Sequence, residues 1–349
     1  MKLGVVIEET WDFFNELYAD FNTGYETRLF ARRKLRSGPF HTRINNALLR
    51  SDMQSFLGSS DVVFFEWASE LLVLASHLPK RCPIVTRLHR YELYQWADRI
   101  NWDAVDRVIL VSEAKRREFV ARFPEQAHKL AVIPVGVDLQ KFEYVERSFA
   151  VGAGANIGIL CHLAPRKRVY ELILAFSELA DRHPLLHLHI GGAAGAAFRD
   201  YEEALHYLVA QLGLQERVTF YGNVKETWNW YPKIDVFVSN SFSEGLQVAP
   251  MEAMAMGCCV LSHRWHGADE LVPLENLYLT DNELVAKLEA YLNLPAAEKQ
   301  AVARGMRQRA CDLFDVYDKI PRINQVIGDA LAQRPPARAV TGASKKTAA

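Results

Sequence analysis

The sequence is poor in cysteine and contains no long hydrophobic run. Its five cysteines are odd in number and form no CxxC pair, and three of them lie within apolar segments. This pattern predicts buried free thiols in a reducing compartment. The apolar run near the N-terminus is interrupted by Glu8 and Glu9 and is too short for a signal peptide. No segment approaches the roughly 20 apolar residues of a membrane span. We therefore expect a cytoplasmic protein.

An excess of charge of one sign is also absent. Lys and Arg number 41 against 42 Asp and Glu, so the bulk charge predicts no nucleic-acid partner. Residues 27–51 depart from this balance, because they contain basic side chains and no acidic one. They indicate peripheral contact of residues 28–43 with an anionic membrane at its inner face, contact with a charged acceptor, or simply a solvated helix and loop. The basic residues are Arg28, Arg32, Arg33, Lys34, Arg36, Arg43 and Arg50.

Short apolar runs rich in β-branched residues alternate with helical patterns along the chain. The runs are continuous, which is typical of parallel strands buried on both faces. Their alternation with helices such as 168–181, 200–212 and 281–292 predicts βαβ units. Their number favours two doubly wound sheets over one very wide sheet. We predict strands at 3–7, 61–65, 83–88, 107–112, 130–135, 156–160, 185–192, 217–222, 235–239 and 258–262.

The same pattern divides the chain into parts. We predict an α/β fold with an N-terminal domain over residues 1–150 and a C-terminal domain over residues 151–332. The periodicity breaks near 141–155, where we expect the join and a hinge, and the last helix is expected to pack back on the first domain. Residues 333–349 are rich in proline, alanine and polar residues, which predicts a disordered tail.

The stretch SEGLQVAPMEAMAMG (243–257) places Glu252 in an apolar helix, eight residues after Glu244. A carboxylate in apolar surroundings is costly unless a partner compensates it. The preceding strand, and Pro250 in a first helical turn, put both carboxylates at the ligand-binding edge of a parallel sheet. Free N–H groups around 245–248 would then seat a phosphate. The alternative is an amphipathic helix with Glu252 on its wet face, but the neighbouring residues are all apolar.

Residues 239–272 (SNSFSEGLQVAPMEAMAMGCCVLSHRWHGADELV) resemble the E-x7-E region of the retaining nucleotide-sugar glycosyltransferases of family 4. That family has the GT-B fold, in which two Rossmann-like, doubly wound domains face each other across a cleft. The resemblance covers roughly residues 83–295 and implies that the first domain binds the acceptor and the second the nucleotide sugar. The other matching segments, in order, are VILVSEAKRREF (108–119), VIPVGVDLQKF (132–142), GILCHLAPRKRVYELILAF (158–176) and RVTFYGNV (217–224).

The resemblance implies roles for residues that bind the nucleotide. Glu252 is expected to accept hydrogen bonds from the two ribose hydroxyls, and Lys167 to face the diphosphate of the leaving group. Asn223 and Val224 lie where backbone groups of the family contact the base.

The resemblance also implies a binding site for the transferred sugar. Glu244 is expected to orient its hydroxyls, beside backbone donors at Gly245 and Leu246. Gln247 replaces the usual glycine of the family and would extend into the sugar pocket. His89, at the end of the strand 83–88, matches the first-domain histidine that faces the donor sugar, and a structural role at a strand end is its alternative.

The diphosphate site departs from the family pattern. His162 stands where the family commonly has an arginine. It would act either as a hydrogen-bond donor to the phosphate or as a packed neutral imidazole. Arg166 and Arg168 flank Lys167, and either would supply a second cation or remain a solvated charge. His162 and Arg168 are the substrate-binding candidates that we predict here.

Taken with the resemblance, the residues predict a retaining glycosyltransferase that moves a sugar from a nucleotide-diphosphate donor to a glycan, lipid-linked or small-molecule hydroxyl acceptor. Polysaccharide or glycoconjugate biosynthesis is the expected context. The sequence has no DxD pair to hold a metal on the diphosphate, so we expect no metal and no cofactor. The alternatives are a GT-B phosphorylase or epimerase, or a non-catalytic GT-B protein that binds a nucleotide or a glycan.

Overall fold

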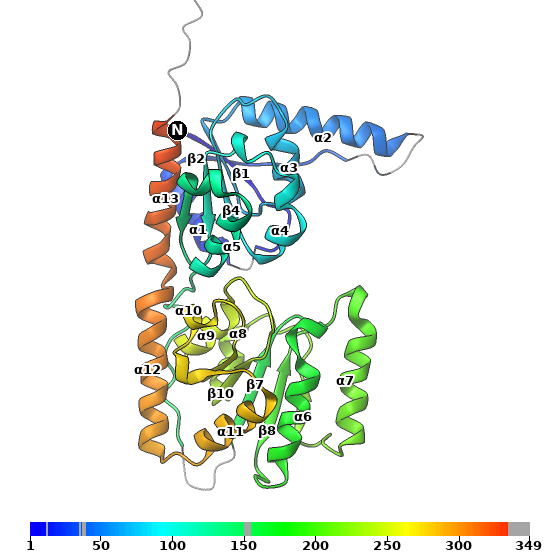
Figure 1. Ribbon diagram of the computed structural model, residues 1–349, viewed down its shortest axis with the longest axis vertical. Coiled ribbons are helices and arrows are strands. Elements are labelled where there is room, and N and C mark those ends of the chain that lie inside the picture. Colours follow the sequence, from blue (N-terminus) through cyan, green and yellow to red (C-terminus); the bar gives the residue numbers. More distant parts are fainter. Residues whose placement is uncertain (12, 35, 37–39, 150–154, 334–349) are drawn as a thin grey trace, which may run out of the picture.

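Figure 1 shows the computed structural model. Two α/β domains, each built on a parallel sheet, follow one another along the longest axis of the molecule. The structure describes residues 1–333 except 12, 35, 37–39 and 150–154. The predicted disordered tail beyond residue 333 and the predicted boundary at residues 150 and 151 therefore lie outside the described residues. Within the described residues, no helix is both long and apolar enough to cross a bilayer.

The first sheet has six strands in the order β2-β1-β3-β4-β5-β6, and its neighbouring strands are parallel. Its inner strands are apolar and buried, as in β3, because helices cover both faces. The strands are β1 (Lys2–Val6), β2 (Glu26–Leu29), β3 (Val62–Phe65), β4 (Ile84–Leu88), β5 (Arg107–Leu110) and β6 (Leu130–Val132). The helices between them are α1 (Asn15–Gly24), α2 (His41–Gly58), α3 (Glu70–Ser76), α4 (Arg90–Gln95) and α5 (Glu113–Arg122).

The second sheet also has six parallel strands, in the order β12-β11-β10-β7-β8-β9. Its strands are β7 (Asn156–Leu160), β8 (His187–Gly191), β9 (Val218–Phe220), β10 (Val236–Ser239), β11 (Cys259–His263) and β12 (Leu277–Tyr278). Its helices are α6 (Val169–Ala180), α7 (Arg199–Gln211), α8 (Thr227–Trp230), α9 (Val248–Ala255), α10 (Ala268–Leu271) and α11 (Asp281–Leu292). The chain ends in α12 (Ala296–Phe314) and α13 (Val316–Ala332).

Each strand predicted from an apolar run is confirmed, and its ends differ from the predicted ones by at most three residues. The prediction missed β2 and β12, which are the outermost strands at one edge of each sheet. β2 is largely exposed and β12 has only two residues, so neither shows a buried apolar run. The presence of β2 also corrects the interpretation of residues 27–51 as helix and loop alone, because this basic segment begins in a strand.

The chain crosses between the two domains twice, and the two crossings are hydrogen-bonded to each other. Val137 N donates to Phe314 O over 2.8 Å, and Val316 N donates to Val137 O over 3.0 Å. A Cβ atom on Gly136 would come within 2.6 Å of Val316 Cα, so glycine is required for this close approach.

The segment that follows the first crossing is anchored to the second domain. Arg147 donates to the carbonyl oxygens of Ile234 (3.0 Å), Tyr231 (3.1 Å) and Met256 (2.6 Å). Part of the segment 141–155, where the sequence predicts a hinge, is therefore bound to the second domain, and the hinge itself stays a prediction.

The last two helices lie along one side of the molecule, α12 beside the second domain and α13 beside the first (Figure 1). Ile320, Ile323 and Ile327 of α13 are buried in the same hydrophobic core as Phe14 and Phe64. The last helix thus completes the core of the first domain.

Candidate active site

A cavity of about 930 Å³ lies where the two domains face each other. Loops that follow β1, β3, β4 and β6 line it from one side, and loops that follow β7, β9 and β10 line it from the other. These loops follow the carboxyl ends of parallel strands, which is the edge where such sheets bind ligands. The candidates from the sequence that line the cavity are His89, Lys167, Asn223, Val224, Glu244, Gly245, Leu246, Gln247 and Glu252.

The connection from β10 to α9 carries most of the site. β10 ends at Ser239, Gln247 is the N-cap of α9, and Pro250 lies in the first turn, where its missing N–H removes no helical hydrogen bond. Glu244 lies in the loop and Glu252 lies inside the helix, so both carboxylates reach the same cavity.

Glu244 is the point on which two cations converge. Lys167 Nζ donates to Glu244 Oε1 over 2.8 Å, and Arg166 Nη1 donates to the same oxygen. The Glu244 residue is only 8% exposed. Burial by itself raises the pKa of this carboxyl, but the charges of Lys167 and Arg166 outweigh burial and hold the pKa below its usual value. The site therefore contains an ionised carboxylate and two cations at neutral pH.

The structure does not bring His162 and Arg168 into this cluster. His162 is exposed, and its Nε2 accepts a hydrogen bond from Gly195 N over 3.3 Å. Arg168 Nη2 donates to Asp281 Oδ1 over 2.6 Å. Neither residue lines the cavity. Arg166, which the sequence left as an alternative to Arg168, is the second cation of the site.

The Glu252 carboxylate has a hydrogen-bond partner within the protein. Tyr231 is fully buried and its hydroxyl donates to Glu252 Oε2 over 2.7 Å. This contact explains how a carboxylate is tolerated beside Met251 and Ala253, which are buried in the core of the second domain.

The Gln247 side chain connects the end of β10 to the loop that follows it. Its Oε1 accepts from the Ser239 hydroxyl, and its Nε2 donates to Ser241 Oγ over 3.1 Å. Ser241 in turn hydrogen-bonds the Glu244 carboxylate. Gln247, which replaces the usual glycine of the family, therefore orients the loop carrying Glu244 and also lines the cavity.

Backbone groups complete the wall. Gly245 lies so close to the first domain that a Cβ atom there would come within 3.2 Å of Arg90 Cβ and of Arg90 N. Arg90 Nε also donates to Ser243 Oγ over 2.7 Å, which joins α4 to this loop across the cleft. Asn223 and Val224 follow β9 and line the same cavity from the second domain.

His89 faces the cavity from the first domain, at the start of α4. Its Nε2 lies 3.3 Å from Glu66 Oε1, and its ring lies 4.3 Å from the Trp67 ring. Glu66 is fully buried, and its Oε1 also accepts hydrogen bonds from Nε and Nη2 of Arg87 over 2.9 and 2.6 Å. Burial lowers the pKa of His89, although the contact with Glu66 opposes the shift. The ring is therefore neutral at pH 7 and held in place.

Sequence reasoning missed two of these partners, Glu66 and Tyr231. Glu66 comes directly after the apolar strand β3, at the ligand-binding edge, and that position is a signal that could have singled it out. No comparable signal marks Tyr231, because its hydroxyl meets Glu252 only when the chain after β9 folds under α9.

Two family models match the chain. "Glycosyltransferase Family 4" matches residues 12–141, and "Glycosyl transferases group 1" matches residues 154–294. The D-inositol 3-phosphate glycosyltransferase 2 of Catenulispora acidiphila is 29% identical over 178 residues, which are 47% of this chain and 42% of that protein. The GDP-mannose-dependent alpha-(1-6)-phosphatidylinositol monomannoside mannosyltransferase of Mycolicibacterium smegmatis is 30% identical over 252 residues, 64% of each chain.

The fold has close counterparts among solved structures. Anabaena HepE, crystallised with UDP and glucose, superimposes with a TM-score of 0.75 at 20% identity and covers 94% of this chain and 99% of that one. The matches to the D-inositol 3-phosphate glycosyltransferases span only 37–42% of the length of those proteins. The two family models together match more than half of the chain. This chain belongs to the family 4 glycosyltransferases and has their GT-B fold.

Proposed function

We propose that this protein is a retaining glycosyltransferase that transfers a sugar from a nucleotide-diphosphate sugar to an acceptor hydroxyl, in polysaccharide or glycoconjugate biosynthesis. The observation that carries the proposal is the convergence of Lys167 and Arg166 on buried Glu244 in the interdomain cavity, with Glu252 in the same cavity. Cationic side chains suit a diphosphate, and carboxylates suit the paired hydroxyls of sugars.

The donor is proposed to bind mainly to the second domain. Glu252 would accept hydrogen bonds from the ribose hydroxyls, since a carboxylate that already accepts from Tyr231 has further acceptor capacity. The diphosphate would take over part of the contact that Lys167 and Arg166 now make with Glu244. Backbone N–H groups of the loop before α9 would add donors at the phosphates.

Retention follows in this proposal from attack on the face that the diphosphate leaves. Glu244 is a poor nucleophile because two cations already engage its carboxylate. The bond between the anomeric carbon and the phosphate oxygen breaks, the bond to the acceptor oxygen forms, and a phosphate oxygen takes the acceptor proton. Lys167 and Arg166 stabilise the charge that develops on the leaving group, and we propose that the reaction needs no metal.

The acceptor is proposed to bind on the side of the first domain. Phe13, Trp67 and Tyr91 line the cavity there, beside neutral His89. Two relatives are named for inositol 3-phosphate and for a phosphatidylinositol monomannoside. A glycan, a lipid-linked sugar and a small hydroxyl compound are the acceptor classes that we propose.

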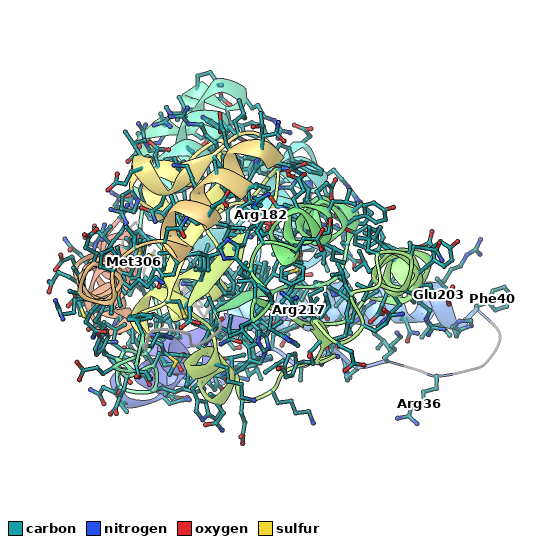
Figure 2. The ribbon with its side chains drawn as sticks, turned by 90° about the horizontal axis from the view of Figure 1, so that it is seen from below. Arg36, Phe40, Arg182, Glu203, Arg217 and Met306 are labelled. Carbon is teal, nitrogen blue, oxygen red and sulfur yellow. The ribbon has the colours of Figure 1, made fainter. Side chains whose placement is uncertain are left out.

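Peripheral membrane contact is proposed for the segment that projects from the first domain with α2 (Figure 1). In Figure 2, Arg36 and Phe40 lie at its tip, beyond the body of the molecule. Phe40 is 72% exposed, and basic side chains from residues 28–43 surround it in the sequence. A basic segment with an exposed aromatic ring suits an anionic lipid surface.

A thermal-shift panel of UDP-, GDP- and ADP-sugars tests the donor. A donor present at 100 times its Kd should stabilise the protein by about 2.7 kcal/mol. We expect Glu252→Ala to weaken donor binding about tenfold or more, because hydrogen bonds to a charged group contribute roughly 1.5–3 kcal/mol. Tyr231→Phe removes the hydroxyl that donates to Glu252 but keeps the carboxylate. Its affinity for the donor should stay within severalfold of the wild-type affinity.

An unchanged donor affinity in Glu252→Ala, or no stabilisation by any donor, would contradict the proposal. Hydrolysis of the bound donor in the absence of acceptor separates an enzyme from a protein that only binds the nucleotide. Release of a sugar phosphate from an oligosaccharide by inorganic phosphate would instead indicate a phosphorylase.

A further inference from the structure

A second cavity of about 530 Å³ lies between α1 and α13, on the first domain. We name it the α1–α13 groove. One wall is the face of α1 that carries Asn15, Glu16, Asp20 and Thr23, and the other is the start of α13, with Tyr317 and Pro321. None of these residues except Asn15 and Glu16 lines the interdomain cavity, so the groove is a separate feature.

The groove lies next to the candidate active site. Asn15 and Glu16 line both cavities. Tyr317 Oη also lies 3.5 Å from Oδ2 of Asp138, another residue of the interdomain cavity. At the other end, Asn324 Nδ2 donates to Asp20 Oδ2 over 2.8 Å and ties α13 to α1. A ligand that extends from the active site past Asn15 and Glu16 would therefore enter the groove.

The groove contains an exposed aromatic ring next to oxygen atoms that can accept hydrogen bonds from hydroxyl groups. Tyr317 is 46% exposed, and Pro321 lies one helical turn further along on the same face of α13. Pro321 has no N–H, so the Tyr317 carbonyl lacks the helical donor that residue 321 would normally supply. An exposed ring beside carboxylate and carbonyl oxygens suits the apolar face and the hydroxyl groups of a sugar.

The charge of the groove selects against anions. Its described lining includes the carboxylates of Glu16 and Asp20 and no Lys or Arg. The cations that suit phosphate, Lys167 and Arg166, lie in the interdomain cavity instead. A phosphate in the groove would face two like charges with no compensating cation, whereas a neutral polyhydroxyl ligand would not.

We propose that the α1–α13 groove binds a second sugar residue of a neutral oligosaccharide acceptor whose terminal residue occupies the interdomain cavity. The protein would then extend a neutral glycan chain and discriminate against acceptors that carry a phosphate on the residue in the groove. This inference rests on the proposed glycosyltransferase function, and it adds the length and the charge of the acceptor.

The test is an array of neutral and phosphorylated glycans of one to four residues, probed in the presence of saturating UDP, GDP or ADP, whichever stabilises the protein. Wild type should retain neutral glycans of two or more residues in preference to monosaccharides and to phosphorylated glycans. Tyr317→Ala should lower retention of the longer neutral glycans about tenfold, which corresponds to roughly 1.4 kcal/mol, and leave nucleotide affinity unchanged. Tyr207→Ala is the matched control, because Tyr207 is 67% exposed on α7 of the second domain.

Four results would overturn the inference. They are retention that does not depend on glycan length, a preference for phosphorylated glycans, a Tyr317→Ala variant that behaves like Tyr207→Ala, and a failure to bind any neutral oligosaccharide. In each of these cases, donor binding that depends on Glu252 together with donor hydrolysis would show that the proposed function stands, and the absence of both would show that both proposals fail.

Discussion

At the scale of single residues, Glu244 is the centre of the site's electrostatics. Its carboxylate is largely buried, yet its pKa is lowered, because Lys167 and Arg166 outweigh the effect of burial. The same contact keeps both cations in the cavity and offsets much of their charge. A diphosphate that enters the site competes with Glu244 for these cations.

This competition predicts opposite effects of Glu244→Gln on binding and on turnover. The variant leaves Lys167 and Arg166 uncompensated, so the affinity for the nucleoside diphosphate should rise severalfold, as titration calorimetry would show. Turnover should fall about tenfold to a hundredfold if Glu244 orients the transferred sugar, since such a hydrogen bond contributes roughly 1.5–3 kcal/mol. Glu178→Gln, on the exposed face of α6, should change neither. Weaker diphosphate binding in Glu244→Gln would contradict the argument.

At the scale of elements, the start of α4 connects the site to the stability of the first domain. Glu92 is fully buried, and its Oε1 accepts a hydrogen bond from His89 N over 3.2 Å, which caps the helix that positions His89. Burial raises the pKa of Glu92 from 4.5 to about 8. The folded protein therefore keeps a proton that the unfolded chain has lost at neutral pH.

This shift predicts that stability falls as the pH rises. The contribution of protonated Glu92 is fully present below the unfolded pKa of 4.5 and is lost as the pH rises through the folded value of about 8. Each pKa unit corresponds to about 1.4 kcal/mol. The side chain in Glu92→Gln cannot ionise. In urea titrations, the free energy of unfolding of this variant should therefore increase relative to that of wild type between pH 5 and pH 8. Glu70→Gln, at an exposed position on α3, should follow the wild-type pH dependence; parallel curves for Glu92→Gln and wild type would refute the assignment.

The sheets show which elements a single sequence can predict. Inner strands such as β3 and β10 are buried on both faces, so they need continuous apolar runs that are visible without a structure. β2 and β12 lie at sheet edges, and their short or polar sequences carry no such pattern. The cap of α11 is a local feature that a sequence pattern can indicate, because Thr280 accepts a hydrogen bond from Glu283 N three residues later.

At the scale of the whole molecule, the two domains are joined across the cleft by contacts besides the paired crossings. Glu270 of α10 accepts hydrogen bonds from Glu113 N and Ala114 N, each at 2.7 Å, and thereby caps α5 of the other domain. His266 Nδ1 lies 2.8 Å from Glu118 Oε1 in the same interface. A carboxylate at a helix N-terminus is a favourable pair that forms only when the domains are close.

Removal of this cap should shift the molecule toward an open arrangement. We expect Glu270→Ala to increase the radius of gyration in small-angle X-ray scattering and to raise the Kd for the donor about threefold to tenfold, because closure would then cost more. Glu275→Ala removes an exposed carboxylate in the loop that follows α10 and serves as the matched control. An unchanged radius and donor affinity in Glu270→Ala would show that the paired crossings alone set the domain arrangement.

The sequence by itself determined the two parallel sheets and the carboxylates that line the cleft. Buried strands require apolar runs, and residues that follow such strands reach the ligand-binding edge, which is how Glu244 and Glu252 could be found, whereas Lys167 was indicated by the family resemblance. Only the tertiary structure decided which neighbour of Lys167 joins the site. Arg166 and Arg168 are adjacent and equally basic, but the turn before α6 directs Arg166 to Glu244 and Arg168 to Asp281. The partners Tyr231 and Glu66, and the groove between α1 and α13, likewise depend on distant segments that meet only in the folded chain. The local sequence shows the periodic pattern of apolar residues at buried positions, whereas the pairing of side chains depends on how the elements cross in space.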